Sequence, residues 1–361
     1  DDVLPFLRNV TRGRGIPDER LEEVAHHYRA FGGVSPINQQ NRDLKAALEA
    51  ELARRGIDLP VLWGNRNWAP YLRDALVEAD ERGFTKLIAI GTSAYSSYSS
   101  CRQYREDYAI ALEETGLAGR VQIDKVRQFF DHPGFVQPFI EGLRQGLADV
   151  AARGIAAADT RVLFSTHSIP TADAAKSGPS ARGFGPDGAY AAQHRSVAEV
   201  VMDAVAGYPA AGAPNGRDDD NGERVEWSLV YQSRSGPPAQ PWLEPDINDA
   251  MRELAALGAK AFVIVPLGFV SDHMEVKWDL DTEAMETAEE LGAFAVRVPT
   301  PGIHQAYVSG LVDLVLERVN GTPTAERPAL TALGPWYDVC RPGCCENARL
   351  GFRPAAAGIA P

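Results

Sequence analysis

The sequence contains no apolar run approaching the roughly 18 residues that a membrane-spanning helix needs. Its first residues, Asp1–Pro5, show no basic region followed by an apolar run. It therefore predicts neither a membrane span nor a secretory signal, and a cytoplasmic location is the default expectation. Positive charge is also scarce, because 36 Lys and Arg residues stand against 49 Asp and Glu residues, a formal net charge of −13. Such an acidic chain is a poor general binder of phosphate backbones, so nucleic acid is not an expected partner.

Several motifs that carry chemistry in α/β proteins are absent. The chain has no GxxxxGK[ST] loop and no GxGxxG turn after a predicted strand, so it offers no evident cradle for nucleotide phosphates. It also lacks a GxSxG nucleophile elbow. These absences remove the main support for a dehydrogenase or a kinase, and we expect no nucleotide cofactor.

Cysteine is rare, with four residues in a chain of 361. Cys101 stands alone, whereas Cys340, Cys344 and Cys345 occur together in Cys-Arg-Pro-Gly-Cys-Cys. A chain of this size has enough core to fold without disulfide bridges. The clustered cysteines therefore indicate ligands of a metal or a cluster rather than bridges.

What the chain does contain is a regular alternation of short apolar segments and amphipathic segments. The expected strands are 60–64, 86–91, 120–126, 161–165, 225–232, 260–267 and 293–298. The expected helices are 3–10, 18–30, 37–55, 70–82, 99–115, 134–153, 187–206, 246–257, 275–291 and 303–319. This alternation predicts an α/β fold with parallel sheets covered by helices on both faces.

The strands fall into two sets, which predicts two doubly wound, Rossmann-like domains over 1–158 and 159–320, followed by an irregular tail over 321–361. A doubly wound domain usually opens with a strand, but this chain opens with a predicted helix, so we expect the first strand to be absent. Residues 209–224 form a low-complexity insertion, in which Asp218–Asp220 fit a solvated loop better than a divalent-ion site.

Two strand ends concentrate polar side chains, and ligands of doubly wound folds bind at such ends. An apolar strand runs directly into His167, for which a hydrogen-bonded strand-end histidine is the alternative interpretation. A second apolar strand leads through Gly268 into a helix where Glu275, Asp279 and Glu283 follow at i, i+4 and i+8. These carboxylates share one helical face. Such a row relays protons, passes a hydrated divalent ion inward, or is simply a solvated acidic face.

Four motifs resemble the ferrochelatase family. They are Ser-Thr-His-Ser-Ile-Pro at 165–170, Gly-Phe-Val-Ser-Asp-His-Met-Glu at 268–275, Tyr-Arg-Ala-Phe-Gly-Gly-Val-Ser-Pro at 28–36, and Tyr-Gln-Ser at 231–233 followed by Pro-Trp-Leu at 241–243. The likeness extends from about residue 3 to 319. It implies two Rossmann-like halves with a porphyrin cleft between them, and insertion of Fe²⁺ into a porphyrin without an organic cofactor.

The resemblance also implies roles for individual residues. His167 and Glu275 are expected to face each other and to handle iron and the pyrrole protons, although the sequence leaves open which residue does which. Asp279 and Glu283 are candidates for a proton or iron relay. The expected porphyrin contacts are Ser35, Tyr28, Phe130, Tyr231 and, as partners of propionates, Arg12 and Arg14. The alternatives are ordinary core positions for the aromatic residues and solvent exposure for the arginines. Ala94 stands where some members carry histidine, so a second metal site there is not expected.

Some members of the family hold a [2Fe–2S] cluster on three tail cysteines and one distant cysteine. Cys101, Cys340, Cys344 and Cys345 match that pattern in number and placement. The alternatives are a zinc site, or a free Cys101 with an oxidised pair in the tail.

Similarity to actinobacterial members, together with an acidic chain that lacks a membrane segment, favours coproporphyrin III over protoporphyrin IX as the substrate. A downstream enzyme of haem synthesis is a candidate partner. Three alternatives stay open: a protoporphyrin IX ferrochelatase, a chelatase for another tetrapyrrole and metal, and a non-catalytic protein that binds or transfers tetrapyrroles.

Overall fold

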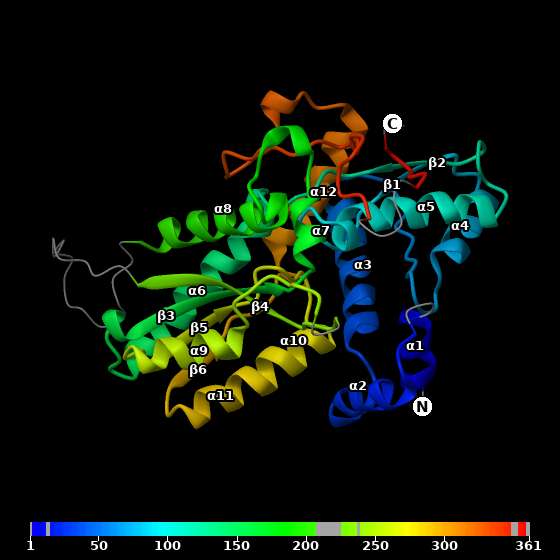
Figure 1. The fold of residues 1–361 in the computed structure, drawn as a ribbon. Helices are drawn as coiled ribbons and strands as arrows, with labels where there is room; N and C mark the ends of the chain where they lie inside the picture. Colours follow the sequence, from blue (N-terminus) through cyan, green and yellow to red (C-terminus); the bar gives the residue numbers. More distant parts are fainter. Residues whose placement is uncertain (1, 12–14, 207–224, 237–238, 348–352, 359–361) are drawn as a thin grey trace.

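The computed structural model describes residues 2–11, 15–206, 225–236, 239–347 and 353–358 (Figure 1). The strands are β1 (Lys86–Ala89), β2 (Gln122–Lys125), β3 (Thr160–His167), β4 (Glu226–Gln232), β5 (Ala261–Val265) and β6 (Phe294–Arg297). The α-helices are α1 (Val3–Val10), α2 (Asp18–Ala30), α3 (Ile37–Arg54), α4 (Leu72–Glu81), α5 (Gln103–Glu114), α6 (Pro133–Ala152), α7 (Thr171–Ala175), α8 (Gly188–Val205), α9 (Ile247–Ala256), α10 (Met274–Trp278), α11 (Ala284–Glu290) and α12 (Gln305–Asn320). Two π-helices, η1 (Tyr98–Arg102) and η4 (Asp279–Glu283), and three 3₁₀-helices, η2 (Ala157–Asp159), η3 (Ser180–Arg182) and η5 (Thr324–Glu326), complete the described elements.

The C-terminal half contains a parallel sheet in the order β4-β3-β5-β6. Successive side chains of β3 point to opposite faces, as in any strand. Val162 and Phe164 join the apolar cluster that includes α6 and α8, whereas Leu163 joins the cluster that includes α9 and α11. Helices therefore cover both faces of the sheet, as Figure 1 shows. This arrangement confirms the predicted α/β fold with parallel sheets.

The N-terminal half has a smaller described sheet, in which β1 pairs in parallel with β2. The prediction of a strand over 60–64 is wrong, because these residues belong to no strand. A strand needs a hydrogen-bonded neighbour, and within the described ranges β1 pairs with β2 alone. The apolar residues Val61 and Leu62, together with Ile88 of β1, line a cavity instead.

Two predicted helices contain a π-helical turn. The helix expected over 99–115 begins as η1 and continues as α5, and the helix expected over 275–291 is divided into α10, η4 and α11. A π-helical turn widens the helix locally and is frequent at functional sites. Both π-helices belong to segments that carry residues singled out above, Cys101 in η1 and Asp279 in η4.

Two glutamine side chains join the N-terminal and C-terminal halves. Gln40 of α3 donates from its side-chain nitrogen to the carbonyl of Asp272 and accepts the backbone N–H of the same residue at 2.8 Å. Gln193 of α8 accepts the N–H of Ser96 at 2.8 Å and donates to its hydroxyl at 3.0 Å. In each glutamine, the side-chain oxygen and nitrogen both bond to a single residue of the other half. These paired bonds fix the distance between the segments that they join.

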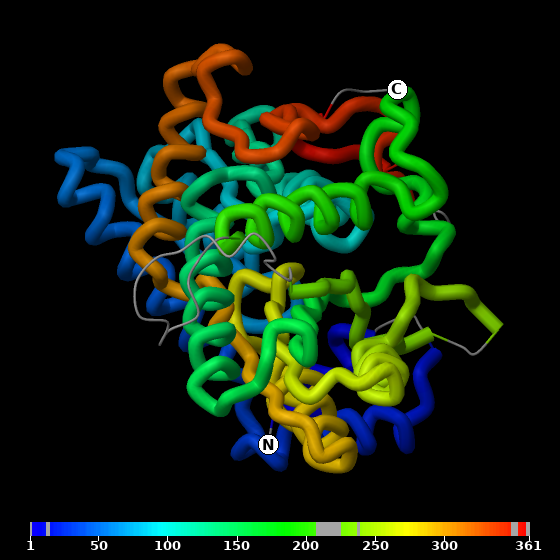
Figure 2. Tube along the Cα trace, turned by 90° about the vertical axis from the view of Figure 1, so that its left-hand side faces the viewer, coloured from blue at the N-terminus to red at the C-terminus, as the bar shows by residue number. Residues whose placement is uncertain are grey.

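The tail runs across the top of both halves. Figure 2 shows its red segment beside the green segment that contains α7. Cys345 donates its N–H to the carbonyl of Lys176 at 3.1 Å, which attaches the tail to the segment that follows α7. Within the tail, Cys340 donates its N–H to the carbonyl of Ala357 at 3.0 Å.

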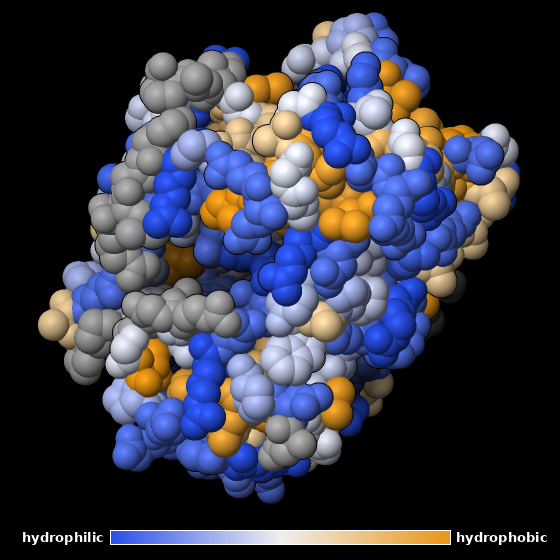
Figure 3. Space-filling view, turned by 90° about the vertical axis from the view of Figure 1, so that its right-hand side faces the viewer, coloured by the Kyte–Doolittle hydropathy of each residue, from blue (hydrophilic) through white to orange (hydrophobic). Residues whose placement is uncertain are grey.

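On the face seen in Figure 3, hydrophilic residues predominate and apolar residues form scattered patches. Among the described helices, none combines the length and the apolar character that a membrane crossing requires.

Candidate active site

The end of β3 is held by a buried hydrogen-bond network. The hydroxyl of Thr166 lies 2.8 Å from the Tyr190 hydroxyl and 2.9 Å from Nε2 of His194, and the Tyr190 hydroxyl donates to the carbonyl of His167 at 2.9 Å. The loop after β5 crosses this strand end at Gly268, where a Cβ would lie 2.1 Å from the Thr166 hydroxyl. Only glycine permits this approach, which brings the start of α10 beside His167.

His167 and Glu275 face each other across this junction. Nε2 of His167 lies 3.5 Å from Oε1 of Glu275, and Nδ1 of His273 lies 3.9 Å from Oε2 of the same carboxylate. The other ring nitrogen of His167, Nδ1, contacts the carbonyl of Ser168. The structure thus brings the two expected residues together and adds a second histidine to the carboxylate.

Electrostatics favours the charged forms of this pair. Burial opposes a charge on His167, but the adjacent Glu275 outweighs it and raises the pKa of His167 to about 9. Burial alone would raise the pKa of Glu275, whereas the charge and hydrogen bond of His167 lower it to about 2. Near neutral pH the free site therefore holds an imidazolium–carboxylate pair.

This pair predicts a pH-dependent contribution to stability. The folded pKa of His167 lies above its ordinary 6.5, so its contribution is complete below pH 6.5 and is lost as pH rises through about 9. The folded pKa of Glu275 lies below its ordinary 4.5, so its contribution is lost as pH falls through about 2. We expect Glu275→Gln to lower the melting temperature most between pH 4.5 and 6.5. Because the pair is half exposed, the decrease should be about 2 °C.

Thermal unfolding of wild type and Glu275→Gln across this pH range measures the effect. The two curves should converge above pH 9, where His167 is neutral. A difference that stays constant across the pH range would contradict the assignment of an ion pair.

Asp279 lies one turn beyond Glu275. Its carboxylate accepts hydrogen bonds from the Ser233 hydroxyl and, at 3.3 Å, from Nε2 of Gln232. Burial raises the pKa of Asp279 to about 7, against the hydrogen bond from Ser233, which lowers it. Glu283 instead accepts the indole N–H of Trp278 at 2.9 Å in a more exposed position. Asp279 therefore gains or loses a proton close to neutral pH, next to the His167–Glu275 pair.

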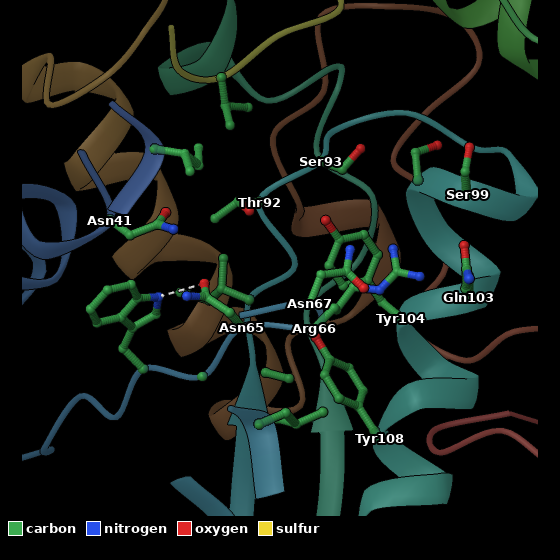
Figure 4. Close-up of a pocket in the computed structure, with 18 of the residues that line it drawn as sticks. Asn41, Asn65, Arg66, Asn67, Thr92, Ser93, Ser99, Gln103, Tyr104 and Tyr108 are labelled. Atoms are coloured by element: carbon green, nitrogen blue, oxygen red, sulfur yellow. Dashed lines mark hydrogen bonds between the residues drawn. The ribbon is translucent and has the colours of Figure 1, made fainter. Parts of the chain in front are cut away.

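The pair opens onto a cavity of about 1950 Å³. Its lining includes His167, His273 and Glu275 from the C-terminal half and continues along 60–68 and 97–100 of the N-terminal half. Figure 4 shows that polar side chains gather on part of this lining; they are Asn41, Asn65, Arg66, Asn67, Thr92, Ser93, Ser99, Gln103 and Tyr104. Arg66 stacks over the Tyr104 ring at 5.1 Å and pairs with Asp107 at 2.5 Å. The cavity therefore combines apolar walls with many hydrogen-bonding groups.

The expected porphyrin contacts lie in different environments. Tyr28 belongs to a small apolar cluster formed by α1 and α2, and it is near enough to Glu275 for the carboxylate to help burial raise the pKa of its phenol. The Ser35 hydroxyl accepts the N–H of Ile37 at 3.3 Å. Phe130 and Tyr231 are buried in the main core and do not line the cavity. Arg12 and Arg14 lie outside the described residues, as do Asp218–Asp220.

Cys101 and the three tail cysteines, which are far from it in the sequence, gather in one buried region, and all four have free thiols. The sulfurs of Cys344 and Cys345 are 3.8 Å apart. Cys340 lies beside them. Cys101 joins them through Arg105, whose side chain hydrogen-bonds to Cys101 and also interacts with Cys340 and Cys344. Within the described part of the chain, no three His, Cys, Asp or Glu side chains converge as ligands of a single metal ion.

Hydrogen-bond donors surround these sulfurs. The N–H of Gly178 donates to Cys345 Sγ at 3.1 Å, Arg102 donates to Cys340 Sγ at 3.8 Å, and the Tyr337 hydroxyl lies 2.9 Å from Cys344 Sγ. Hydrogen bonding to Cys344 and burial raise the pKa of Cys340. A thiolate in this region therefore requires compensating positive charge.

Sequence reasoning missed several residues of these sites. His273 precedes Glu275 by two positions, but a single histidine in a loop is too common to stand out. The sequence around Gln40 and Lys125 does not indicate a role for either residue. Their partners, Asp272 for Gln40 and the cysteines for Lys125, come close only in the folded chain. Burial lowers the pKa of Lys125 to about 8, although the nearby Cys101 and Cys340 act in the opposite direction.

Comparison with known proteins gives consistent matches. A family model described as ferrochelatase matches residues 1–319. The coproporphyrin III ferrochelatase of Leifsonia xyli is 70% identical over 369 residues, covering 100% of this chain and 91% of that protein. The coproporphyrin III ferrochelatase of Tropheryma whipplei is 58% identical, covering 100% and 89%. That of Streptomyces griseus is 50% identical, covering 99% and 92%.

Among solved structures, the sirohydrochlorin chelatase SirB of Bacillus subtilis subspecies spizizenii, in complex with cobalt, has a TM-score of 0.50. The alignment covers 80% of this chain and 92% of that one at 12% identity. At this identity the likeness concerns the fold alone.

Proposed function

The chain belongs to the ferrochelatase family, and we propose that it inserts Fe²⁺ into coproporphyrin III, giving coprohaem and two protons. The observation that carries this proposal is the His167–Glu275 pair, 3.5 Å apart at the wall of a cavity of about 1950 Å³. Pockets for ordinary small ligands measure roughly 300–1,000 Å³. This cavity is therefore large enough for a macrocycle.

His167 and Glu275 are proposed to receive the iron. Imidazole and carboxylate both suit divalent iron. His167 is protonated in the free pair, so Fe²⁺ that binds its imidazole displaces that proton. When iron moves on to the porphyrin nitrogens, His167 takes up a proton from solvent and the imidazolium–carboxylate pair re-forms. The pair is therefore neutral overall before iron binds and again after iron has left.

Metal insertion also releases the two pyrrole protons, and we assign Asp279 to receive them one at a time, the first passing on before the second is taken up. Its pKa of about 7 suits a group that gains and loses protons under working conditions. It lies one helical turn from Glu275, and Gln232 links the two by donating to the carbonyl of Glu275 at 3.0 Å. Glu283, four residues beyond Asp279 and more exposed, is the proposed continuation toward solvent.

Coproporphyrin III is the proposed porphyrin. The names of relatives that are 70%, 58% and 50% identical support it. The polar groups in Figure 4 support it as well, since a porphyrin with four carboxylates needs more hydrogen-bond donors than one with two.

Anaerobic iron insertion with the two porphyrins compared tests the proposal. We expect kcat/KM for coproporphyrin III to exceed that for protoporphyrin IX by about tenfold or more, because unpaired polar groups penalise the less polar substrate. Loss of porphyrin fluorescence on metal insertion gives the rates, and sirohydrochlorin with Co²⁺ serves as the rival pair. A preference for protoporphyrin IX would refute the substrate assignment. Cobalt insertion without iron insertion would refute the proposed reaction.

We also propose that Cys101, Cys340, Cys344 and Cys345 hold a [2Fe–2S] cluster, which needs four thiolates. The surroundings of the four thiols suit an anionic cluster. All four thiols are buried, and hydrogen-bond donors lie beside three of the sulfurs. The positive charge of Arg105 lies among them. Such a cluster supplies a one-electron redox centre. By connecting η1 to the tail, it would also fasten the C-terminal segment to the N-terminal half.

The domain boundaries at 158 and 320, the cytoplasmic location and a downstream haem-pathway enzyme as partner stay predictions. So do the porphyrin contacts of Ser35, Tyr28, Phe130, Arg12 and Tyr231.

A further inference from the structure

Two fully buried cations lie beside the cysteines with only neutral hydrogen-bond partners. Lys125, at the end of β2, is 0% exposed, and Arg105, in α5, is 1% exposed. The Lys125 ammonium donates to the carbonyl of Val126 at 3.1 Å and to Oε1 of Gln128 at 2.6 Å. The Arg105 guanidinium donates to the carbonyls of Ala357 at 2.6 Å and Asp338 at 2.7 Å. In the part of the chain that the structure describes, neither forms a salt bridge to a carboxylate.

Other buried cations of the same molecule are balanced by acids. Arg127 pairs with Asp131 at 2.7 Å and Glu317 at 2.9 Å. Arg102, next to Cys101, pairs with Glu106 at 3.0 Å. Burying a charge without a counter-charge is strongly unfavourable, so the exception at Lys125 and Arg105 needs a physical explanation.

The titratable groups that favour the charged forms of these two cations are the thiols and, as the smallest influence on Lys125, the carboxylate of Asp338. Lys125 interacts electrostatically with Cys101 and Cys340, and Arg105 with Cys101, Cys340 and Cys344. The nearby carboxylate of Asp338 is already paired with Arg327 at 2.7 Å. Among the described residues, the cysteine sulfurs are therefore the remaining source of negative charge for Lys125 and Arg105.

We infer that Lys125 and Arg105 are the counter-charges of the four-cysteine cluster and that they raise its reduction potential. This inference rests on the proposed [2Fe–2S] cluster. Four thiolates around the oxidised cluster carry a net charge of −2, and the reduced form carries −3. A nearby positive charge stabilises the more negative form more strongly, especially where water is excluded. Removal of either cation then makes the cluster harder to reduce.

Lys125→Met tests this, because it removes the charge while keeping the length of the side chain. The measurement is an anaerobic reductive titration of the purified holoprotein, with dithionite as the electron donor and visible absorption and electron paramagnetic resonance as readouts. We expect the reduction equilibrium to shift at least tenfold toward the oxidised form, about 59 mV for a one-electron couple. Lys125→Arg, which keeps the charge, should stay near the wild-type potential.

Lys86→Met is the matched control, since Lys86 is an exposed lysine of the neighbouring strand β1; it should leave the potential unchanged. A cluster of normal iron and sulfide content with an unchanged potential in Lys125→Met would overturn the inference. Wild-type protein that binds no iron and sulfide would instead refute the cluster itself, so the two failures are distinguishable.

If the Lys125→Met holoprotein does not accumulate, the same substitution is made in the Cys101→Ser variant. The melting temperature of this double variant then tests the inference. Without the anionic cluster, the buried ammonium has lost its counter-charge. We therefore expect Lys125→Met to be tolerated in that background, with a melting temperature at or above that of Cys101→Ser alone. Equal damage in both backgrounds would mean that Lys125 serves packing alone, which overturns the inference.

Discussion

Replacing His167 with alanine should lower kcat for iron insertion by about 10²–10⁴-fold, the range typical of removing a positioned acid–base group. Of the two facing residues, His167 lies on a strand. Its backbone is fixed by the hydrogen bond from Tyr190 and by the pairing of β3 with β4. The substitution removes a proposed iron ligand and leaves Glu275 without its partner at 3.5 Å. Binding of coproporphyrin III, followed by fluorescence, should persist because the cavity walls are unchanged.

His304→Ala is a suitable control for this experiment. His304 caps α12 by accepting the N–H of Ala306 at 3.2 Å, and its other ring nitrogen contacts Glu141 at 3.1 Å. Losing the cap should lower stability by about 1 kcal/mol, while insertion should continue at the wild-type rate. Unchanged insertion in His167→Ala would refute its assignment to the reaction.

Cys101→Ser should abolish the cluster. Cys101 is the one cysteine outside the tail, so without its thiolate the tail cysteines have no fourth sulfur ligand. We expect complete loss of the visible absorption of the cluster and of acid-labile sulfide. We also expect a lower melting temperature, because the link between η1 and the tail is broken. The His167–Glu275 pair lies elsewhere and should remain intact.

Iron and sulfide analysis of anaerobically purified protein gives the measurement, and Ser99→Ala in the same π-helix should retain the full content. A colourless wild-type protein that carries zinc would rule out the cluster. Because His167→Ala should keep the cluster while Cys101→Ser loses it, the two variants separate the active-site chemistry from the cluster.

The sequence allowed the strand ends to be located because their signals are local. An apolar run of fixed length that stops at His167 places that residue at a sheet edge, whatever the rest of the fold does. Likewise, Gly268 between an apolar strand and an amphipathic helix marks a close crossing. The juxtaposition of His167 and Glu275, however, followed from the family resemblance, since nothing in either segment alone specifies the other.

Errors arose where structure depends on distant partners. The run 60–64 has the composition of a strand, yet strand formation depends on a neighbouring backbone, which composition does not report. The π-helix η4 has the sequence of an ordinary helix, because its extra width is set by packing. Nothing in Gln-Ile-Asp-Lys sets Lys125 apart, and only the fold reveals that it is buried beside the cysteines.

The side-chain amide of Gln40 holds α3 against the loop that leads to Glu275. It holds the N–H and the carbonyl of Asp272, three residues before Glu275, so any separation of α3 from that loop breaks both hydrogen bonds together. At about 1 kcal/mol each, these two hydrogen bonds add about 2 kcal/mol to the cost of moving α3 away from that loop. The spacing between α3 and the segment leading to Glu275 is therefore set by the fold before any ligand binds.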